Sequence, residues 1–250
     1  MEDNAWIFQT VAGVFYVMAG IPLLRLASRS GQAPERILGT TFLLMGISYG
    51  FYQAPIIFAS LVPHEVPLTV VGRLAYDASV VMIAFFTRGV FRNREAWATG
   101  LVCASVVLLV AGLVVSVGYG DWNGYAPLAN PGYWLEFTGQ VIPCTWIAIE
   151  GFLQHRKLQK RVHFGLSDPA VCNRLLLWSL FGAMQLATIV VLVKMNLEYE
   201  ARGVFSVAMD ALEGLFEMLT ILMIWLAFFP PRFYRSWVSG RNRTQCAGTD

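Results

Sequence analysis

Seven long apolar runs, each close to 20 residues, follow one another along this chain. They are Ala5–Leu24, Leu38–Phe58, Leu68–Phe86, Trp97–Val117, Tyr133–Leu153, Leu175–Val193 and Val204–Phe229. A helix needs about 20 largely apolar residues to cross a bilayer. The runs lack the alternation of barrel strands, and a helix is the other structure that pairs all its backbone groups inside lipid. The pattern therefore predicts an all-α, polytopic membrane protein, a bundle of seven transmembrane helices.

The composition agrees with this interpretation. Hydrophobic residues make up 56% of the chain and charged residues 14%, against about 25% charged in an average soluble domain. This balance excludes a disordered chain, a secreted disulfide scaffold and an ordinary soluble enzyme. We expect one transmembrane domain over residues 1–230 and a short basic tail over 231–250. The longest predicted loops are 118–132 and 155–174.

The orientation follows from the basic residues. Most of the 18 Lys and Arg residues follow the first, third, fifth and seventh runs. Because Lys and Arg resist translocation, we expect the N-terminus outside and the C-terminus in the cytoplasm. Anionic lipid headgroups account for a basic face of this kind, so membrane lipids are expected partners and nucleic acid is not. A plasma membrane or bacterial inner membrane is the expected location.

Short local similarities suggest an internal duplication. The second run opens near the letters ERIL at Glu35 and the sixth near NRLL at Asn173. The third run holds AYDA from Ala75 and the seventh AMDA from Ala208. Two three-helix units lie parallel only when one extra helix separates them, and the fourth run has that place. The sequence therefore suggests a 3+1+3 repeat.

A 3+1+3 layout resembles the sugar-transporting SWEET and PQ-loop families. The hallmark of those families is a Pro-Gln dipeptide in the first and fifth helices. Here Pro22 precedes Leu23 and Pro143 precedes Cys144. The resemblance therefore covers the architecture alone, and it implies no site residues.

The seventh run carries three carboxylates. Asp210, Glu213 and Glu217 fall within about 60° of one another at 100° per helical residue. An ionised side chain near the bilayer centre costs roughly 2.5–3.5 kcal/mol, so these acids should face the bundle interior. The stripe predicts a functional site.

The third run places Arg73, Tyr76 and Asp77 on one face. Asp77 lies at about the depth of Glu213, counted inward from the outer surface at about 1.5 Å per residue. We expect Arg73 to be the counter-ion of Asp77 or Asp210.

The fifth and sixth runs add further polar groups. Glu136, Gln140 and Glu150 share one face of the fifth run, and Gln185 lies in the middle of the sixth. Several aromatic residues lie deep enough to line a pocket: Tyr16, Tyr49, Tyr52, Tyr76 and Trp146.

Together these residues predict an outward-opening polar pocket bounded by the third, fifth and seventh runs. Its proton-transferring or catalytic groups are predicted to be Asp77, Glu213 and Glu217. Its binding residues are predicted to be Arg73, Tyr76, Gln140, Trp146, Gln185 and Asp210. The structural alternative is an interhelical network that only holds the helices together.

Three functions fit such a pocket. The first is transport, in which the acids bind and move a proton, a cation or a small solute, with Gln185 and Glu150 continuing the path to the cytoplasm. The second is a membrane enzyme that uses Glu213 or Glu217 as a general acid on an isoprenoid-type lipid, as a cyclase or isomerase does. Fungal and bacterial membrane terpene cyclases of this size have seven helices, but the Trp-Glu motif of the fungal group's second helix is absent from the second run. The third is a ligand sensor that acts through a separate partner.

No cofactor or metal is expected. A retinal protein needs a lysine inside the bundle, and Lys194 lies at the membrane edge. The histidines, His64, His155 and His163, fall in predicted loops on opposite sides of the membrane, so they cannot form a zinc site. A GxxxG pattern from Gly46 permits close helix contact, within the chain or in a homo-oligomer.

Overall fold

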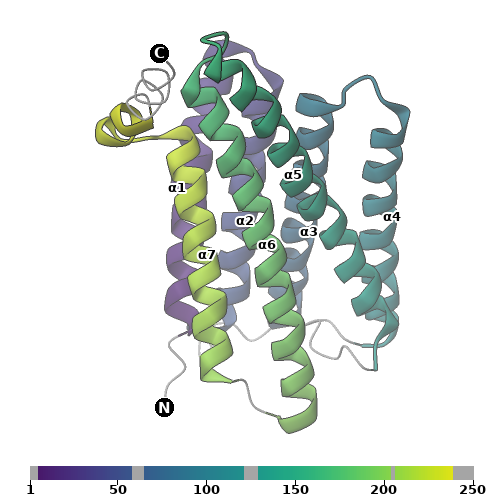
Figure 1. Ribbon diagram of the computed structural model, residues 1–250. Coiled ribbons are helices and arrows are strands. Elements are labelled where there is room, and N and C mark those ends of the chain that lie inside the picture. The colour runs from purple at the N-terminus through teal and green to yellow at the C-terminus, as the bar shows by residue number, and fades with distance from the viewer. Residues whose placement is uncertain (1–4, 58–64, 121–128, 204–205, 239–250) are drawn as a thin grey trace.

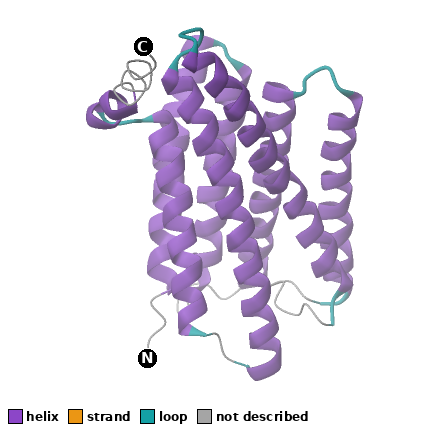
Figure 2. Ribbon diagram, in the orientation of Figure 1, coloured by secondary structure: helices purple, strands orange, loops and turns teal. Residues whose placement is uncertain are grey.

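The computed structural model describes residues 5–57, 65–120, 129–203 and 206–238. Over this part of the chain every regular element is a helix and there is no strand (Figures 1 and 2). Seven long helices are followed by a short one over residues 232–238. The long helices are α1 (Ala5–Ser30), α2 (Ala33–Ile57), α3 (Glu65–Phe91), α4 (Ala96–Gly118), α5 (Pro131–His163), α6 (Pro169–Arg202) and α7 (Val207–Phe228). The predicted all-α fold is confirmed.

Five of the helices, α1, α3, α4, α6 and α7, are long and apolar enough to cross a membrane. Their outward faces are also apolar. On α4, the side chains of Val107, Val110 and Val114 are 64%, 57% and 66% exposed. Large exposed apolar surfaces are rare on soluble monomers and are typical of membrane contact. The chain is therefore a membrane protein, whereas spans by α2 and α5, and so the count of seven, stay predictions.

The helices extend beyond the apolar runs. The segment 155–174, predicted as a loop, is mostly helical, since α5 continues to His163 and includes His155. Asp168 caps the start of α6, because its side chain accepts a hydrogen bond from a backbone N–H two residues on. Gly203 ends α6 in the left-handed conformation, with φ of 72°, which favours glycine. The loop assignment of these two histidines was therefore wrong, and His64 lies outside the described residues.

The helices form a ring of six with one helix outside it. Helices α1, α2 and α3 pack consecutively and form the first half, and α5, α6 and α7 form the second half in the same way. The halves meet at two seams, where α3 packs on α5 and α1 packs on α7. Helix α4 lies at the edge of the bundle, against α5 and the end of α3 (Figure 1). The interior of the ring is therefore enclosed by both halves.

Helix α4 packs on α5 through a narrow stripe of small residues. Its buried residues recur at alternating steps of four and three: Ala98, Val102, Ser105, Leu109, Gly112 and Ser116. A Cβ atom at Gly112 would lie 2.7 Å from the backbone N of Glu136 and 2.8 Å from the backbone O of Gly132. The two backbones thus approach as closely as glycine allows, as small residues permit in membrane helices.

We expect Gly112→Leu to lower the free energy of unfolding by about 1–3 kcal/mol or more, because the added side chain would force the two backbones apart. The matched control is Gly100→Leu on the same helix, where a Cβ meets nothing within 4 Å. Thermal unfolding in detergent measures both variants. Equal midpoints for the two would contradict the close α4–α5 contact.

An aromatic layer fills one end of the ring. It consists of Phe42, Phe86, Trp178, Phe181 and Phe228, which belong to one core cluster or pack against it. Ring centroids lie 4.9 Å apart for Phe86 and Trp178 and 5.5 Å apart for Trp178 and Phe228. Edge-to-face and tilted pairs at such distances stabilise packing. This end of the interior is filled by side chains.

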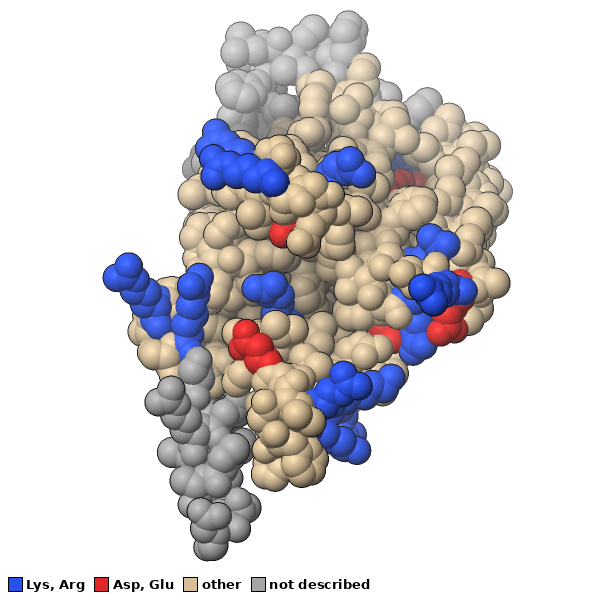
Figure 3. Space-filling model, turned by 90° about the horizontal axis from the view of Figure 1, so that it is seen from above, with Lys and Arg blue, Asp and Glu red and all other residues tan. Residues whose placement is uncertain are grey.

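The same end of the molecule carries most of the basic side chains (Figure 3). They come from the ends of α1, α3 and α5, the turn between α3 and α4, the starts of α2 and α6, and the short last helix. They are Arg25, Arg29, Arg36, Arg88, Arg92, Arg94, Arg156, Lys157, Lys160, Arg161, Arg174, Arg232 and Arg235. We call this the basic end. The predicted basic tail is described to residue 238, and its remainder lies outside the described residues.

Candidate functional site

The charged residues predicted to face inward are buried. The exposed fractions of Arg73, Asp77, Glu213 and Glu217 are 5%, 8%, 4% and 3%. Asp210, in the first turn of α7, is half-buried. The acids of α7 therefore point into the ring and not at lipid.

Arg73 of α3 forms an ion pair with Glu136 of α5. Its Nε donates to Glu136 Oε2 over 3.0 Å, and Nη2 donates to the same oxygen. Nη2 also donates to Ser116 Oγ of α4, at 3.0 Å. The expected counter-ion was Asp77 or Asp210. The ion pair in the structure is with Glu136, because α5 is the ring neighbour of α3, and Asp77 lies within electrostatic reach of the same guanidinium.

Asp77 lies one helical turn further along the same seam. Gln140 of α5 donates from Nε2 to Asp77 Oδ1, at 3.4 Å. Both seam contacts join residues 63 apart in the sequence, since α3 and α5 run parallel with matching four-residue spacings. That shared spacing was the sequence signal for the Arg73–Glu136 pair. We call Arg73, Asp77, Ser116, Glu136 and Gln140 the arginine cluster.

Glu217 lies at the other seam, where α1 meets α7. The Tyr16 hydroxyl of α1 donates to Glu217 Oε2, at 3.1 Å. Tyr49 of α2 stacks on Tyr16 with centroids 5.8 Å apart, and Tyr49 and Gln185 are close neighbours of the same carboxylate. We call Tyr16, Tyr49, Gln185, Glu213 and Glu217 the tyrosine cluster. Tyr16 and Tyr49 were predicted only as deep aromatic residues, because helical periodicity does not reveal a partner on another helix.

Tyr76 connects the two clusters. It is half-buried on α3, beside Asp77, and lies within electrostatic reach of both Tyr16 and Tyr49. The prediction was a single pocket between the third, fifth and seventh runs. The structure has two polar clusters, one at each seam, and Tyr76 of α3 lies between them.

Two buried hydroxyl groups near the tyrosine cluster have no hydrogen-bond partner among the described residues. They are Thr188 Oγ1 and Thr220 Oγ1, on side chains that are 2% and 0% exposed. Leaving such a group unpaired costs about 1–3 kcal/mol. A bound water, ion or ligand can supply the partner that such a group lacks.

Trp146 lies away from both clusters. It packs with Ala84, Ala98 and Val102, and its ring centroid is 5.7 Å from that of Trp97. The structure therefore places Trp146 between α3, α4 and α5 near the basic end, and not in the wall predicted for it.

Glu150 is buried at the basic end of the α3–α5 seam. Arg92, just after α3, forms an ion pair with it at 2.9 Å, and Gln154 donates to it at 3.0 Å. Arg92 also pairs with Glu95 at 3.1 Å. The hydrogen bond from Trp97 Nε1, with Arg92 beside it, lowers the pKa of Glu95 and keeps it ionised.

The predicted path from Gln185 to Glu150 is filled in this structure. Ile147 and Trp178 belong to the core on the basic side of Gln185 and are 0% and 4% exposed. The tyrosine cluster is thus closed toward the basic end by the aromatic layer.

Comparison of the chain with models of protein families, with curated proteins and with solved structures found no match. Within the described residues there is also no group of three or more His, Cys, Asp or Glu side chains that could hold a metal ion.

Proposed function

We propose that this protein is a transporter that binds a proton or small cation, alone or with a small solute, inside the six-helix ring. The observation that carries the proposal is that the buried ionisable groups meet across the seams. Tyr16–Glu217 joins α1 to α7, and Arg73–Glu136 joins α3 to α5. The basic end faces the cytoplasm in this proposal.

Contacts across a seam couple binding to the arrangement of the two halves. A carboxylate that takes up a proton loses its charge and its strongest hydrogen bonds. Protonation of Glu217 would therefore weaken its bond from Tyr16 and shift the balance between arrangements of the halves. Rocking of two helical units around a central site is a common transport mechanism.

The structure supports a state that is closed at the basic end. The ion pair between Arg92 and Glu150 joins the end of α3 to α5 there, and the aromatic layer fills the ring interior next to it. Passage to the cytoplasm would require both to separate. The buried hydroxyl groups of Thr188 and Thr220 support binding of a species that can form hydrogen bonds with them.

The helix order supports the 3+1+3 repeat. In such a repeat α1, α2 and α3 correspond to α5, α6 and α7. The α3–α5 contact then requires a matching contact between α7 and α1, and the structure has both contacts. Helix α4 stands outside the ring, as a linker between two parallel units would. We propose that the halves are related in this way.

The second candidate function is a membrane enzyme with Glu217 as general acid. The specific observation in its favour is that Tyr16, Tyr49 and Gln185 surround one buried carboxyl group, with the aromatic layer on its side toward the basic end. Aromatic faces stabilise positive charge, as a reaction through a carbocation requires.

Proteoliposomes loaded with a pH-sensitive dye distinguish the two functions. A transporter dissipates an imposed pH gradient faster than empty liposomes do, directly or when a co-transported solute is added. An enzyme leaves the gradient unchanged and alters an isoprenoid lipid in detergent, which mass spectrometry detects. Product formation without any flux would overturn the transport proposal.

A further inference from the structure

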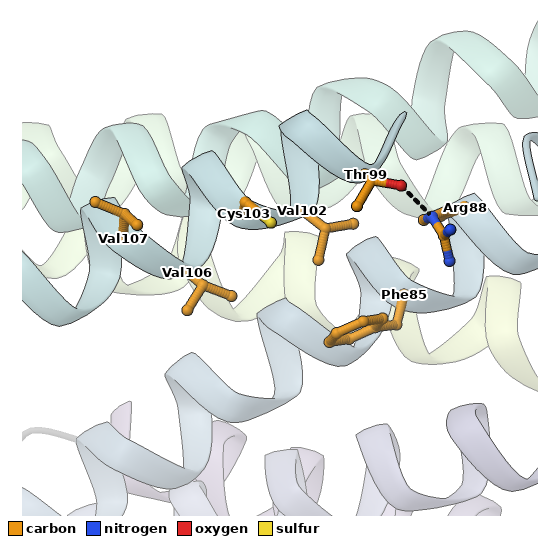
Figure 4. Close-up of a pocket in the computed structure, with 7 residues that line it drawn as sticks. All are labelled: Phe85, Arg88, Thr99, Val102, Cys103, Val106 and Val107. Carbon is orange, nitrogen blue, oxygen red and sulfur yellow. Dashed lines mark hydrogen bonds between the residues drawn. The ribbon is translucent and has the colours of Figure 1, made fainter. Parts of the chain in front are cut away.

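A groove opens between α3 and α4 on the outer surface of the bundle (Figure 4). Its volume is about 310 Å³, within the range of small-molecule sites. Its walls are Phe85 and Arg88 of α3, and Thr99, Val102, Cys103, Val106 and Val107 of α4. The groove is apolar along its length and charged at one end.

The groove follows from how α4 is held. Its buried stripe is directed at α5, where Ser105 Oγ donates to the backbone O of Gly139 at 2.6 Å. Its contact with α3 is less extensive. Phe85 and Val107 are 43% and 64% exposed, so the groove faces the surroundings of the bundle and not the ring interior.

The depth of the groove matches one leaflet. Trp97, 47% exposed, lies at the basic end of α4, and tryptophan favours the membrane interface. Thr99 follows two residues later, and Val107 is eight residues further on. Eight residues span about 12 Å at the helical rise, close to the roughly 15 Å of hydrocarbon in one leaflet.

The charged end of the groove holds a positioned cation. Arg88 Nε donates to Thr99 Oγ1 at 2.9 Å, which fixes the guanidinium over the groove (Figure 4). Its terminal nitrogens can donate hydrogen bonds to a phosphate group. Arg88 forms no ion pair within the described part of the chain. Arg92, by contrast, is committed to Glu150 and Glu95.

We propose that this groove binds one anionic phospholipid from the leaflet at the basic end. One acyl chain lies along Val102, Val106 and Val107, and the phosphate group accepts hydrogen bonds from Arg88. The apolar length, the lateral opening and the cation that lines the groove at headgroup depth all match this ligand. The site is separate from the two polar clusters.

Native mass spectrometry tests the proposal on protein released from bilayers of phosphatidylglycerol and phosphatidylcholine. The wild type should retain phosphatidylglycerol in preference to phosphatidylcholine. Arg88→Gln should lower this retention about fivefold or more, with Arg94→Gln, at an exposed position outside the groove, as its control. Val106→Trp, which fills the groove, should lower it as well, with Val110→Trp as its control.

Each arm has a contradicting result. Equal retention of the two lipids, or retention unchanged by Arg88→Gln, would overturn the headgroup contact. Loss with Arg88→Gln but not with Val106→Trp would overturn the groove as the acyl-chain site. Thermal unfolding of each variant shows that the fold is intact, and Cys103→Trp is the second groove-filling variant.

Discussion

Replacing Glu217 with Gln should abolish proton-driven flux in proteoliposomes, with a rate reduction of roughly 100-fold or more, the range expected when a positioned proton-transfer group is lost. Glutamine keeps the shape of the side chain and can still accept from Tyr16, but it cannot take up and release a proton. Glu217 is 3% exposed at the α1–α7 seam, so bulk water cannot readily take over the proton transfer.

The matched control is Glu198→Gln. Glu198 lies near the C-terminal end of α6, away from the basic end. Its side chain is 25% exposed and pairs with Lys194 at 3.9 Å. The same chemical change there should leave the flux near the wild-type rate. Tyr16→Phe should lower the flux less than Glu217→Gln, because it removes one donor and leaves the carboxyl group. Wild-type flux in Glu217→Gln would refute the role of Glu217.

The second large effect concerns stability. Arg73→Gln should lower the free energy of unfolding by about 3–5 kcal/mol, the usual cost of leaving a buried charge without its partner. The side chains of Arg73 and Glu136 are 6% and 8% exposed, so water does not compensate. Thermal unfolding in detergent and the yield of folded protein measure this loss.

The double variant Arg73→Met with Glu136→Leu should recover most of that stability, because it removes both charges together. Lys194→Gln is the control for an exposed pair, and it should change stability by only about 0–1 kcal/mol. Arg73→Gln as stable as the wild type would contradict a buried, mutually dependent pair. The double variant also separates roles: recovered stability with lost flux would assign the pair a function beyond packing.

Much of the fold was predictable because apolar run length reports directly on helices in lipid. The helix ends were not, since hydropathy detects only the part in hydrocarbon. Helix α5 extends ten residues past Leu153, where the fifth run was predicted to end, to His163. Helix α6 begins at Pro169, directly after the capping residue Asp168. Such capping depends on local backbone geometry that the apolar pattern does not record.

The inward direction of Glu213 and Glu217 was predictable from their shared stripe. Their partners were not, because helical periodicity shows which residues share a face and not which helix that face meets. The ring order brings α1 to α7 and α3 to α5, and this decides that Tyr16 meets Glu217 and Glu136 meets Arg73. Trp146 shows the same limit, since its depth alone suggested a pocket that its neighbours exclude.

We expect the two halves to move relative to each other when the buried acids change protonation. Spin labels at Gly89→Cys on α3 and Lys157→Cys on α5, in a background lacking the native cysteines, measure the distance across the seam at the basic end. Both sites suit labelling, since a Cβ at Gly89 meets nothing within 4 Å and Lys157 is exposed. A pair at Gly89→Cys and Arg36→Cys, within the first half, is the control.

We predict two distance populations across the seam, whose proportions change between mildly acidic and mildly alkaline pH. The distance of the control pair should stay the same. Glu217→Gln should remove the pH dependence. A single distance across the seam that is the same at every pH would contradict the account and leave the clusters as packing networks.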